Sequence, residues 1–152
     1  MDDDTFRPTG ARDDPDHPGW LTHGSFRPGS FASATGKLIF RPDGDARAIV
    51  RMFPDDSMLN PGGSVHGGAV MSFIDMAMFS GGRCAGMAEG HYVTLDCTTH
   101  FLGRARAGQP LDAYVELVRQ TRSFAFVQGV VRQGGEACYS FTGTLKRVRD
   151  PR

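Results

Sequence analysis

The most constraining feature of the sequence is a glycine-rich turn that runs directly into a long apolar segment. The turn spans Asn60–Gly68 and contains Asn-Pro and Gly-Gly pairs, which are strong turn signals. The segment Ala69–Phe79 carries a single charge, at Asp75, and shows no period-two alternation. It is therefore predicted to be a helix that is apolar, and hence buried, on almost every side. Free N–H groups and the positive end of the helix dipole would favour a developing negative charge at the turn.

Asp75 has two interpretations, because a lone carboxylate on a buried helix is energetically costly. It is either a structural group that is satisfied by local hydrogen bonds and holds two subunits in register, or a general base or nucleophile. The functional interpretation is favoured, since an unpaired carboxylate is an expensive way to obtain structure.

The position of Asp75 along the helix also predicts a dimer. If the helix starts near Gly67, Asp75 lies about 12 Å further along its axis. The helix N-terminus and Asp75 of one chain therefore cannot both contact the same small reacting group. If both act, they come from different chains with antiparallel helices, and a helix that is apolar all round requires a second cover in any case.

Composition favours a soluble cytoplasmic protein with one domain. The chain has 152 residues and a formal net charge of zero, which gives no reason to expect a nucleic-acid partner. Three widely spaced cysteines without a C-x-x-C pair argue against disulfides or zinc and for a reducing compartment. The N-terminus lacks the features of a signal peptide, and no apolar run is long enough to cross a membrane.

Three parts of the chain differ in character. Residues 1–33 form an arm rich in Asp, Pro and Gly, expected to be poorly ordered over about the first fifteen residues, although its aromatic residues could dock on the domain. Residues 34–148 form the predicted domain, and residues 149–152 a short tail. Within the domain, Asp-Gly between two apolar runs predicts a hairpin over residues 36–53, and residues 123–148 predict a second, longer one.

Two further segments read as strands. Residues 91–101 alternate, with Val93, Leu95 and Cys97 on one face and Thr94 and Asp96 on the other, and residues 111–120 form another strand. About six antiparallel strands around one long helix, expected to end near Gly81-Gly82, define an α+β fold.

Two short motifs are rejected. Gly62 to Gly67 matches G-x-x-x-x-G, but Gly68-Ala69 follows where a P-loop requires Lys-Ser/Thr. Gly82 to Gly86 matches a nucleophile elbow with Cys84 at its centre, but it follows a helix instead of a strand. A glycine helix stop with an inert buried thiol is the better interpretation. The five histidines show no paired metal spacing, so no metal site is predicted.

The order of these features resembles the hotdog-fold acyl-CoA thioesterases, in particular the phenylacetyl-CoA/medium-chain branch. The resemblance covers roughly residues 34–148. It is carried by the hairpin, Asn60-x5-His66-Gly67-Gly68, the helix with Asp75, Val93-Thr94-Leu95-Asp96 and the antiparallel strands that follow. It implies a homodimer, which could pair into a tetramer, and hydrolysis to a free acid and coenzyme A, with no cofactor beyond the coenzyme A of the substrate.

The resemblance also implies roles for single residues. Gly67 would offer its N–H to the thioester oxygen as an oxyanion hole, with Gly68 beside it, and Asn60 would orient the thioester or the water. His66 would support the loop and, as a catalytic residue, could form a hydrogen bond near the carbonyl. Asp75 of the other subunit would activate water or attack the carbonyl.

Thr94 would position that water or bind the Asp75 carboxylate. Since the alternation puts Thr94 on the polar face, either the strand is irregular there or that face lines the dimer cleft. The candidate contacts to the phosphates of coenzyme A are Arg104, Arg106, Arg122 and Ser123.

Two other functions compete with a thioesterase: a hotdog-fold acyl-CoA hydratase or dehydratase, and a non-catalytic acyl-CoA-binding protein. The carboxylate spacing favours hydrolysis. The acyl group is not specified by the sequence, but an apolar tunnel could be lined by Met58, Met71, Phe73, Met76, Phe79 and Met87, for which core packing is the alternative.

Overall fold

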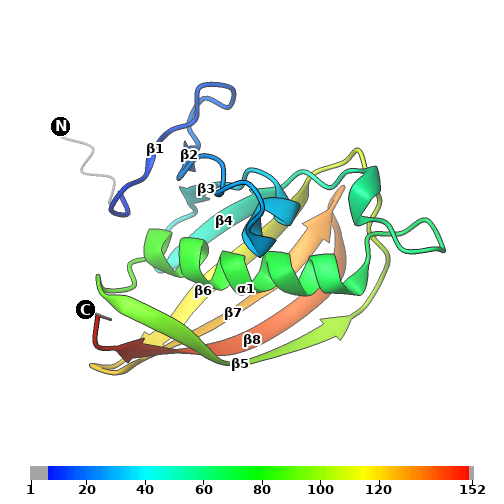
Figure 1. The fold of residues 1–152 in the computed structure, drawn as a ribbon. Coiled ribbons are helices and arrows are strands. Elements are labelled where there is room, and N and C mark those ends of the chain that lie inside the picture. The colour runs from blue at the N-terminus through cyan, green and yellow to red at the C-terminus, as the bar shows by residue number, and fades with distance from the viewer. Residues whose placement is uncertain (1–6, 151–152) are drawn as a thin grey trace.

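The computed structural model describes residues 7–150 and has one long helix lying across a curved antiparallel sheet (Figure 1). Helix α1 spans Gly67–Cys84 and packs mainly against the strands β4, β6 and β3. Its other flank faces the strand β5. The α+β hotdog architecture predicted from the sequence is confirmed.

The sheet has eight strands in the order β1-β2-β3-β4-β6-β7-β8-β5, and every neighbouring pair is antiparallel. The strands span Arg12–Asp13 (β1), Leu21–Thr22 (β2), Ile39–Pro42 (β3), Arg47–Met52 (β4), His91–Phe101 (β5), Leu111–Gln120 (β6), Phe124–Gln133 (β7) and Glu136–Val148 (β8). The last six are those predicted, and two short strands of the arm extend the sheet beyond β3. Two short 3-10 helices, η1 (Phe31–Thr35) and η2 (Asp56–Met58), complete the chain.

The predicted end of the helix near Gly81-Gly82 is wrong. The helix continues to Cys84, and the reversal comes at Gly86, whose φ is 102°. Gly81 serves packing instead, since a Cβ atom there would lie 2.7 Å from the side chain of Val115 on β6. In the sequence alone, a glycine that is needed for close packing against a strand looks the same as a glycine that ends a helix.

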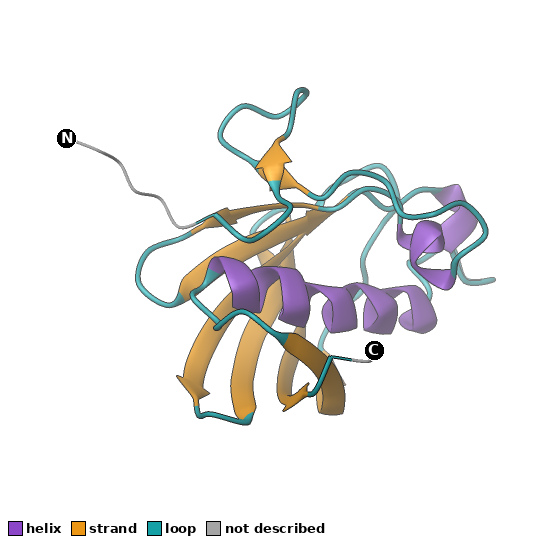
Figure 2. Cartoon of the chain, turned by 60° about the vertical axis from the view of Figure 1, so that its left-hand side comes forward, coloured by secondary structure: helices purple, strands orange, loops and turns teal. Residues whose placement is uncertain are grey.

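The helix is also less enclosed than predicted. Its inward face is buried and comprises Val70, Phe73, Ile74, Ala77, Met78, Gly81, Gly82 and Cys84. Met71, Ser72, Asp75, Met76 and Phe79 lie on the opposite side and stay partly exposed in the single chain. One chain therefore covers about half of the helix, as Figure 2 shows from the side.

The alternation predicted for β5 is interrupted by a bulge. Thr94 pairs with Leu145 of β8, but Asp96 pairs with Thr144, so Leu95 is an extra residue. A bulge shifts the faces of all residues that follow it. Tyr92 and Cys97 are both partly buried although they lie five residues apart, whereas Val93 and Leu95, expected on the inward face with Cys97, are exposed.

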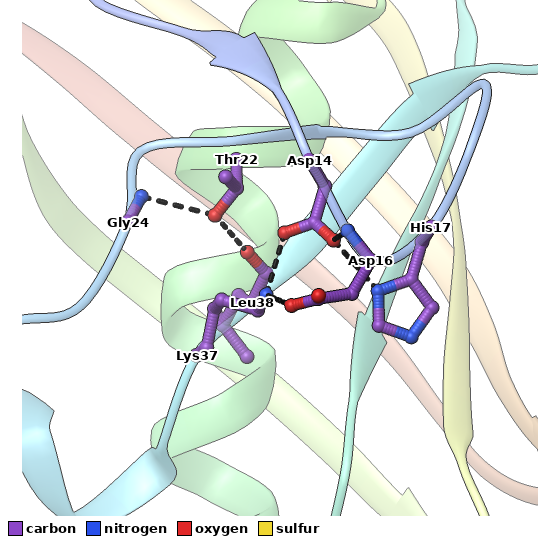
Figure 3. A network of polar contacts seen from close by, with 7 residues as sticks. All are labelled: Asp14, Asp16, His17, Thr22, Gly24, Lys37 and Leu38. Atoms are coloured by element: carbon purple, nitrogen blue, oxygen red, sulfur yellow. Dashed lines mark hydrogen bonds and ion pairs between the residues drawn. The ribbon is translucent and has the colours of Figure 1, made fainter.

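The arm folds onto the sheet from residue 7 onward, unlike the poorly ordered tail expected for about fifteen residues; residues 1–6 lie outside the described residues. Asp14 is fully buried, and its carboxylate contacts Lys37 Nζ at 2.6 Å and His17 Nδ1 at 2.7 Å (Figure 3). Trp20 lies beneath the guanidinium groups of Arg41 and Arg51. Lys37, Arg41 and Arg51 lie far along the chain from the residues they contact, so composition does not reveal these contacts. The predicted boundary at residue 34 stays a prediction, as does that of the tail.

The Asp14–Lys37 pair predicts a specific dependence of stability on pH. The pKa of Asp14 is lowered to about 2, chiefly by its hydrogen bond from Lys37. A carboxyl with a folded pKa below its unfolded value of about 3.9 stabilises the fold above that value and loses this effect as the pH falls through the folded pKa. Asp14→Asn should therefore lower the free energy of unfolding at neutral pH, and the difference from wild type should shrink between about pH 4 and pH 2.

Urea unfolding over that pH range measures the effect. Asp13→Asn is the control, because the Asp13 side chain is 80% exposed and pairs only with Arg7 in the described part of the chain. If the loss of unfolding free energy in Asp14→Asn were the same at pH 2 as at neutral pH, the ion pair could not be its cause.

Candidate active site

The turn before α1 is held in one shape by its own polar groups. The Asn60 side-chain oxygen accepts a hydrogen bond from Ser64 N–H at 3.1 Å, and Asn60 N–H donates to Ser64 O at 2.7 Å. His66 is the N-cap of the helix, and its Nδ1 accepts from Gly68 N–H at 2.8 Å. A Cβ atom on Gly68 would lie only 3.0 Å from that nitrogen, so glycine permits the close approach. His66 therefore caps the helix through its bond to Gly68 N–H.

A cavity of about 440 Å³ opens on one side of this turn. Asn60 and Gly67 line it together with Arg104, and Phe101 and Tyr139 form its aromatic wall. Gly67 is the first residue of the helix, where N–H groups have no partner within the helix. The helix dipole adds positive potential at the same point. We call this cavity the loop cavity. It is suited to bind a carbonyl oxygen that carries partial negative charge, with an anionic group close by.

Asp75 and Thr94 form the second polar pair of the site. Thr94 Oγ1 donates to Asp75 Oδ1 at 2.6 Å. The strand is irregular at Leu95, which was one of the two alternatives that the sequence left open for Thr94 to reach the site. Asp75 does not line the loop cavity of its own chain, so one chain keeps the carboxylate and the Gly67 N–H apart.

The four predicted contacts to coenzyme A fall into two groups at opposite ends of the helix. Arg104 lines the loop cavity, and the neighbouring Arg106 is exposed, with its N–H bonded to Gln133 Oε1 at 2.8 Å. Arg122 and Ser123 form the exposed turn between β6 and β7. This turn lies near the helix C-terminus, because the Gln120 side chain bonds the backbone of residues 86 and 88. One chain does not bring the two groups together.

The cysteine of the rejected elbow motif is inert, as expected. Cys84 is buried at the end of α1, and burial raises the pKa of its thiol to about 12. A thiol with that pKa supplies almost no thiolate at neutral pH. Among residues 7–150, no group of three His, Cys, Asp or Glu side chains is arranged to hold a metal ion.

The apolar residues proposed for a tunnel do not line one continuous space, and Met71 is partly exposed and lines neither of the two cavities named below. Phe73 and Met87 are completely buried and belong to the core. Met58 lines one surface cavity, and Met76 and Phe79 line another. Both cavities have a second wall from the arm, at residues 23–35, which the sequence did not assign to the site. The only sequence signal for this wall was the set of aromatic residues in the arm.

Comparison with known proteins agrees with the geometry. The family model of the thioesterase superfamily matches residues 62–139, just over half of the chain. The chain belongs to the thioesterase superfamily, and the resemblance stated from the sequence is confirmed. No curated protein matches the chain by sequence. No helix in the described residues has the length and apolar character needed to cross a membrane.

Several solved structures are similar. The Escherichia coli PaaI protein from the phenylacetic acid degradation operon is 25% identical with a TM-score of 0.66, over 77% of this chain and 83% of that one. A mutant of the phenylacetic acid degradation protein PaaI from Thermus thermophilus is 26% identical (TM-score 0.62; 78% and 98% covered).

A hypothetical thioesterase from Streptococcus pneumoniae, solved with coenzyme A, is 21% identical with a TM-score of 0.67, over 79% of this chain and 92% of that one. At this identity the likeness concerns the fold alone. The fold and the family together make this chain a thioesterase of the hotdog type.

The capping role of His66 leads to a stability prediction. His66→Ala removes the acceptor for Gly68 N–H and should lower the free energy of unfolding by about 1 kcal/mol. His66→Asn is the matched control, since asparagine is a good N-cap and should keep most of that stability. Urea unfolding measures both variants. Equal losses in the two variants would show that the cap is not the reason for the effect.

Proposed function

We propose that the protein is an acyl-CoA thioesterase that hydrolyses a medium-chain or aromatic acyl-CoA, with each active site shared between two chains. The observation that carries the proposal is the pair of polar sites on one helix. A donor site lies at the N-terminus of α1, and a partly exposed carboxylate with its own hydrogen-bond donor lies two turns further on.

The loop cavity supplies the electrophilic side of the reaction. Gly67 N–H donates to the thioester oxygen and stabilises the negative charge that develops on it, as an oxyanion hole does. The Asn60 oxygen is engaged by Ser64 N–H, which leaves the Asn60 amide NH₂ to orient the thioester or the water. Arg104, on the wall of the same cavity, binds a phosphate of coenzyme A.

Asp75 supplies the basic side. Thr94 occupies Oδ1 of the carboxylate and fixes its orientation, so Oδ2 is the oxygen that accepts a proton. A water molecule held by Asp75 then attacks the carbonyl carbon. The tetrahedral intermediate collapses with cleavage of the C–S bond, the proton passes to the thiolate, and a free acid and coenzyme A leave. No cofactor is invoked in this scheme.

Two features of the chain support a dimer in which Asp75 serves the neighbouring loop. The outer edge of β5 has no partner strand within the described chain, and Val93, Leu95, Phe101 and Leu102 of this region are 44–59% exposed. Long apolar edge strands are sites of pairing with another chain. Pairing of β5 with its copy would set the two helices antiparallel and bring the partner's Asp75 toward Gly67.

The same arrangement accounts for the separated coenzyme A contacts. With antiparallel helices, the C-terminal end of one helix lies near the N-terminal end of the other. The turn carrying Arg122 and Ser123 of the partner then approaches Arg104 and Arg106. Phosphates of one coenzyme A would be bound from both chains.

Removing the carboxylate tests the proposed base. Asp75→Asn should reduce kcat for release of free thiol from octanoyl-CoA and phenylacetyl-CoA by about 10²- to 10⁴-fold, the usual contribution of a general base. Asp96→Asn is the matched control, because Asp96 is an exposed carboxylate on the same strand as Thr94. Both variants should keep the unfolding midpoint of wild type to within a few degrees.

Three outcomes would contradict the proposal. Equal rates for Asp75→Asn and wild type would remove Asp75 from the mechanism. No thiol release by wild type, with acyl-CoA still bound, would favour a non-catalytic binding protein. Addition of water to an enoyl-CoA without thiol release would favour a hydratase.

Isotope labelling detects a nucleophilic Asp75 whose anhydride is hydrolysed at the protein carbonyl. In a single turnover in H₂¹⁸O, activation of water places one ¹⁸O atom in the free acid and none in the protein. Direct attack by Asp75 forms an anhydride, and its hydrolysis at the protein carbonyl leaves ¹⁸O in Asp75. Mass spectrometry of the acid and of the peptide containing Asp75 is expected to find the label only in the acid.

A further inference from the structure

A second cavity lies on the other side of the same helix N-terminus. Its volume is about 540 Å³, and it lies between η1, the residues 57–59 and the first turn of α1. Gly68 and His66 line it, whereas Gly67 lines the loop cavity. Consecutive Cα atoms are about 3.8 Å apart, so the linings of the two cavities are one residue step apart at this point.

We propose that this cavity, called here the acyl chamber, receives the acyl group of the substrate, so that the N-terminal arm determines which acyl groups are accepted. The proposal rests on the function proposed above. A thioester whose oxygen is bound by Gly67 N–H has two substituents, which must leave in different directions. The coenzyme A side extends along the loop cavity toward Arg104, and the acyl side crosses His66 and Gly68 into the acyl chamber.

The chemistry of the acyl chamber suits an uncharged apolar group. Its walls come mainly from Phe31, Ala34, Met58, Leu59 and Ala69, and no Asp, Glu, Lys or Arg lines it. The loop cavity, by contrast, includes Arg104. Apolar walls with few polar groups are typical of small-molecule sites of this size. A medium-chain or aromatic acyl group fits this description.

The arm is fixed firmly enough to act as a wall. Lys37 lies two residues after the end of η1, and its ammonium group is bound by the buried Asp14 carboxylate. Thr22 Oγ1 donates to Leu38 O at 2.9 Å and accepts from Gly24 N–H at 3.0 Å (Figure 3). These contacts hold both ends of residues 24–37 and so position η1 beside the helix. The family match begins at residue 62, so this wall lies outside it.

One contact joins a wall of the acyl chamber to Met76. Thr35 Oγ1, which lines the chamber, donates to Met76 Sδ at 3.5 Å. Beyond Met76 lies a smaller cavity of about 220 Å³, walled by His23, Phe26 and Phe79. Burial, with a smaller effect of Arg12, lowers the pKa of His23, so this cavity is also uncharged at neutral pH. Met76 therefore separates two apolar cavities and limits the length of the acyl chain.

The test uses thioether analogues of the substrate, S-ethyl-CoA and S-octyl-CoA, whose binding does not depend on hydrolysis. Ala34 is exposed, so Ala34→Phe fills the acyl chamber without disturbing the core. By isothermal titration calorimetry, Ala34→Phe should weaken S-octyl-CoA at least tenfold and change S-ethyl-CoA less than twofold. Ala32→Phe is the control, because Ala32 lies on the same turn but outside the cavity, and should leave both affinities near wild type.

A second variant is expected to act in the opposite direction. Met76→Ala joins the two cavities and should favour S-dodecyl-CoA over S-octyl-CoA at least fivefold relative to wild type. The proposal is overturned if Ala34→Phe weakens both analogues equally or neither of them. It is also overturned if Ala34→Phe changes only the mass of the protein in sedimentation, since the groove would then be covered by a second copy of the chain.

Thiol release by wild type is measured separately and reports on the proposed function alone. Chain-length-dependent binding without thiol release would retain the acyl chamber and reject the hydrolase. Thiol release by wild type, without any effect of Ala34→Phe on the chain-length profile, would retain the hydrolase and reject the acyl chamber.

Discussion

The rigidity of one α-helix is the constraint on which the functional account depends. The N–H of Gly67 and the carboxylate of Asp75 are fixed on the same helix, about 12 Å apart along its axis. A buried helix that packs against several strands does not shorten or bend to bring them together. A thioester carbonyl and its attacking water occupy only a few ångströms, so a site that uses both groups is built from two helices. The exposed edge of β5 and the half-covered face of α1 are consistent with that requirement.

Small irregularities of the backbone then decide which side chains face the reaction. The extra residue at Leu95 puts Cys97 on the same side of the strand as Thr94, which donates to Asp75. The N-cap at His66 binds Gly68 N–H, and the neighbouring Gly67 lines the loop cavity. Bulges and caps of this kind change local direction by one residue without altering the sheet or the core. They therefore orient functional groups on a rigid scaffold at little cost in stability.

The sequence predicts the main elements well, because their signals are local. The turn at Asn60–Gly68, the apolar helix and the strands of residues 111–148 follow from turn residues and periodicity alone. The family resemblance, in turn, rests on few residues at fixed spacing. What the sequence misses depends on contacts between distant residues. Gly81 appears as a helix stop because its partner, Val115, lies on another element.

The arm illustrates the same limit for the candidate site. Its Asp-rich composition suggests a flexible tail, whereas Asp14 is neutralised by Lys37 and buried. No local pattern connects these two residues or places η1 beside the helix. The walls of the two apolar cavities therefore emerge only in three dimensions. The proposed active site is harder still to predict from the sequence, since it involves a second copy of the chain.

The most direct test of the central claim is complementation between two inactive variants. Asn60→Asp keeps the oxygen that accepts Ser64 N–H but removes the amide donor, and Asp75→Asn removes the base. If each site combines the loop of one chain with Asp75 of the other, a mixed dimer of the two variants contains one intact site. After unfolding and refolding of an equal mixture, random pairing in a symmetric dimer should restore about a quarter of wild-type thiol release. Activity no higher than that of the separate variants would contradict a site shared between chains.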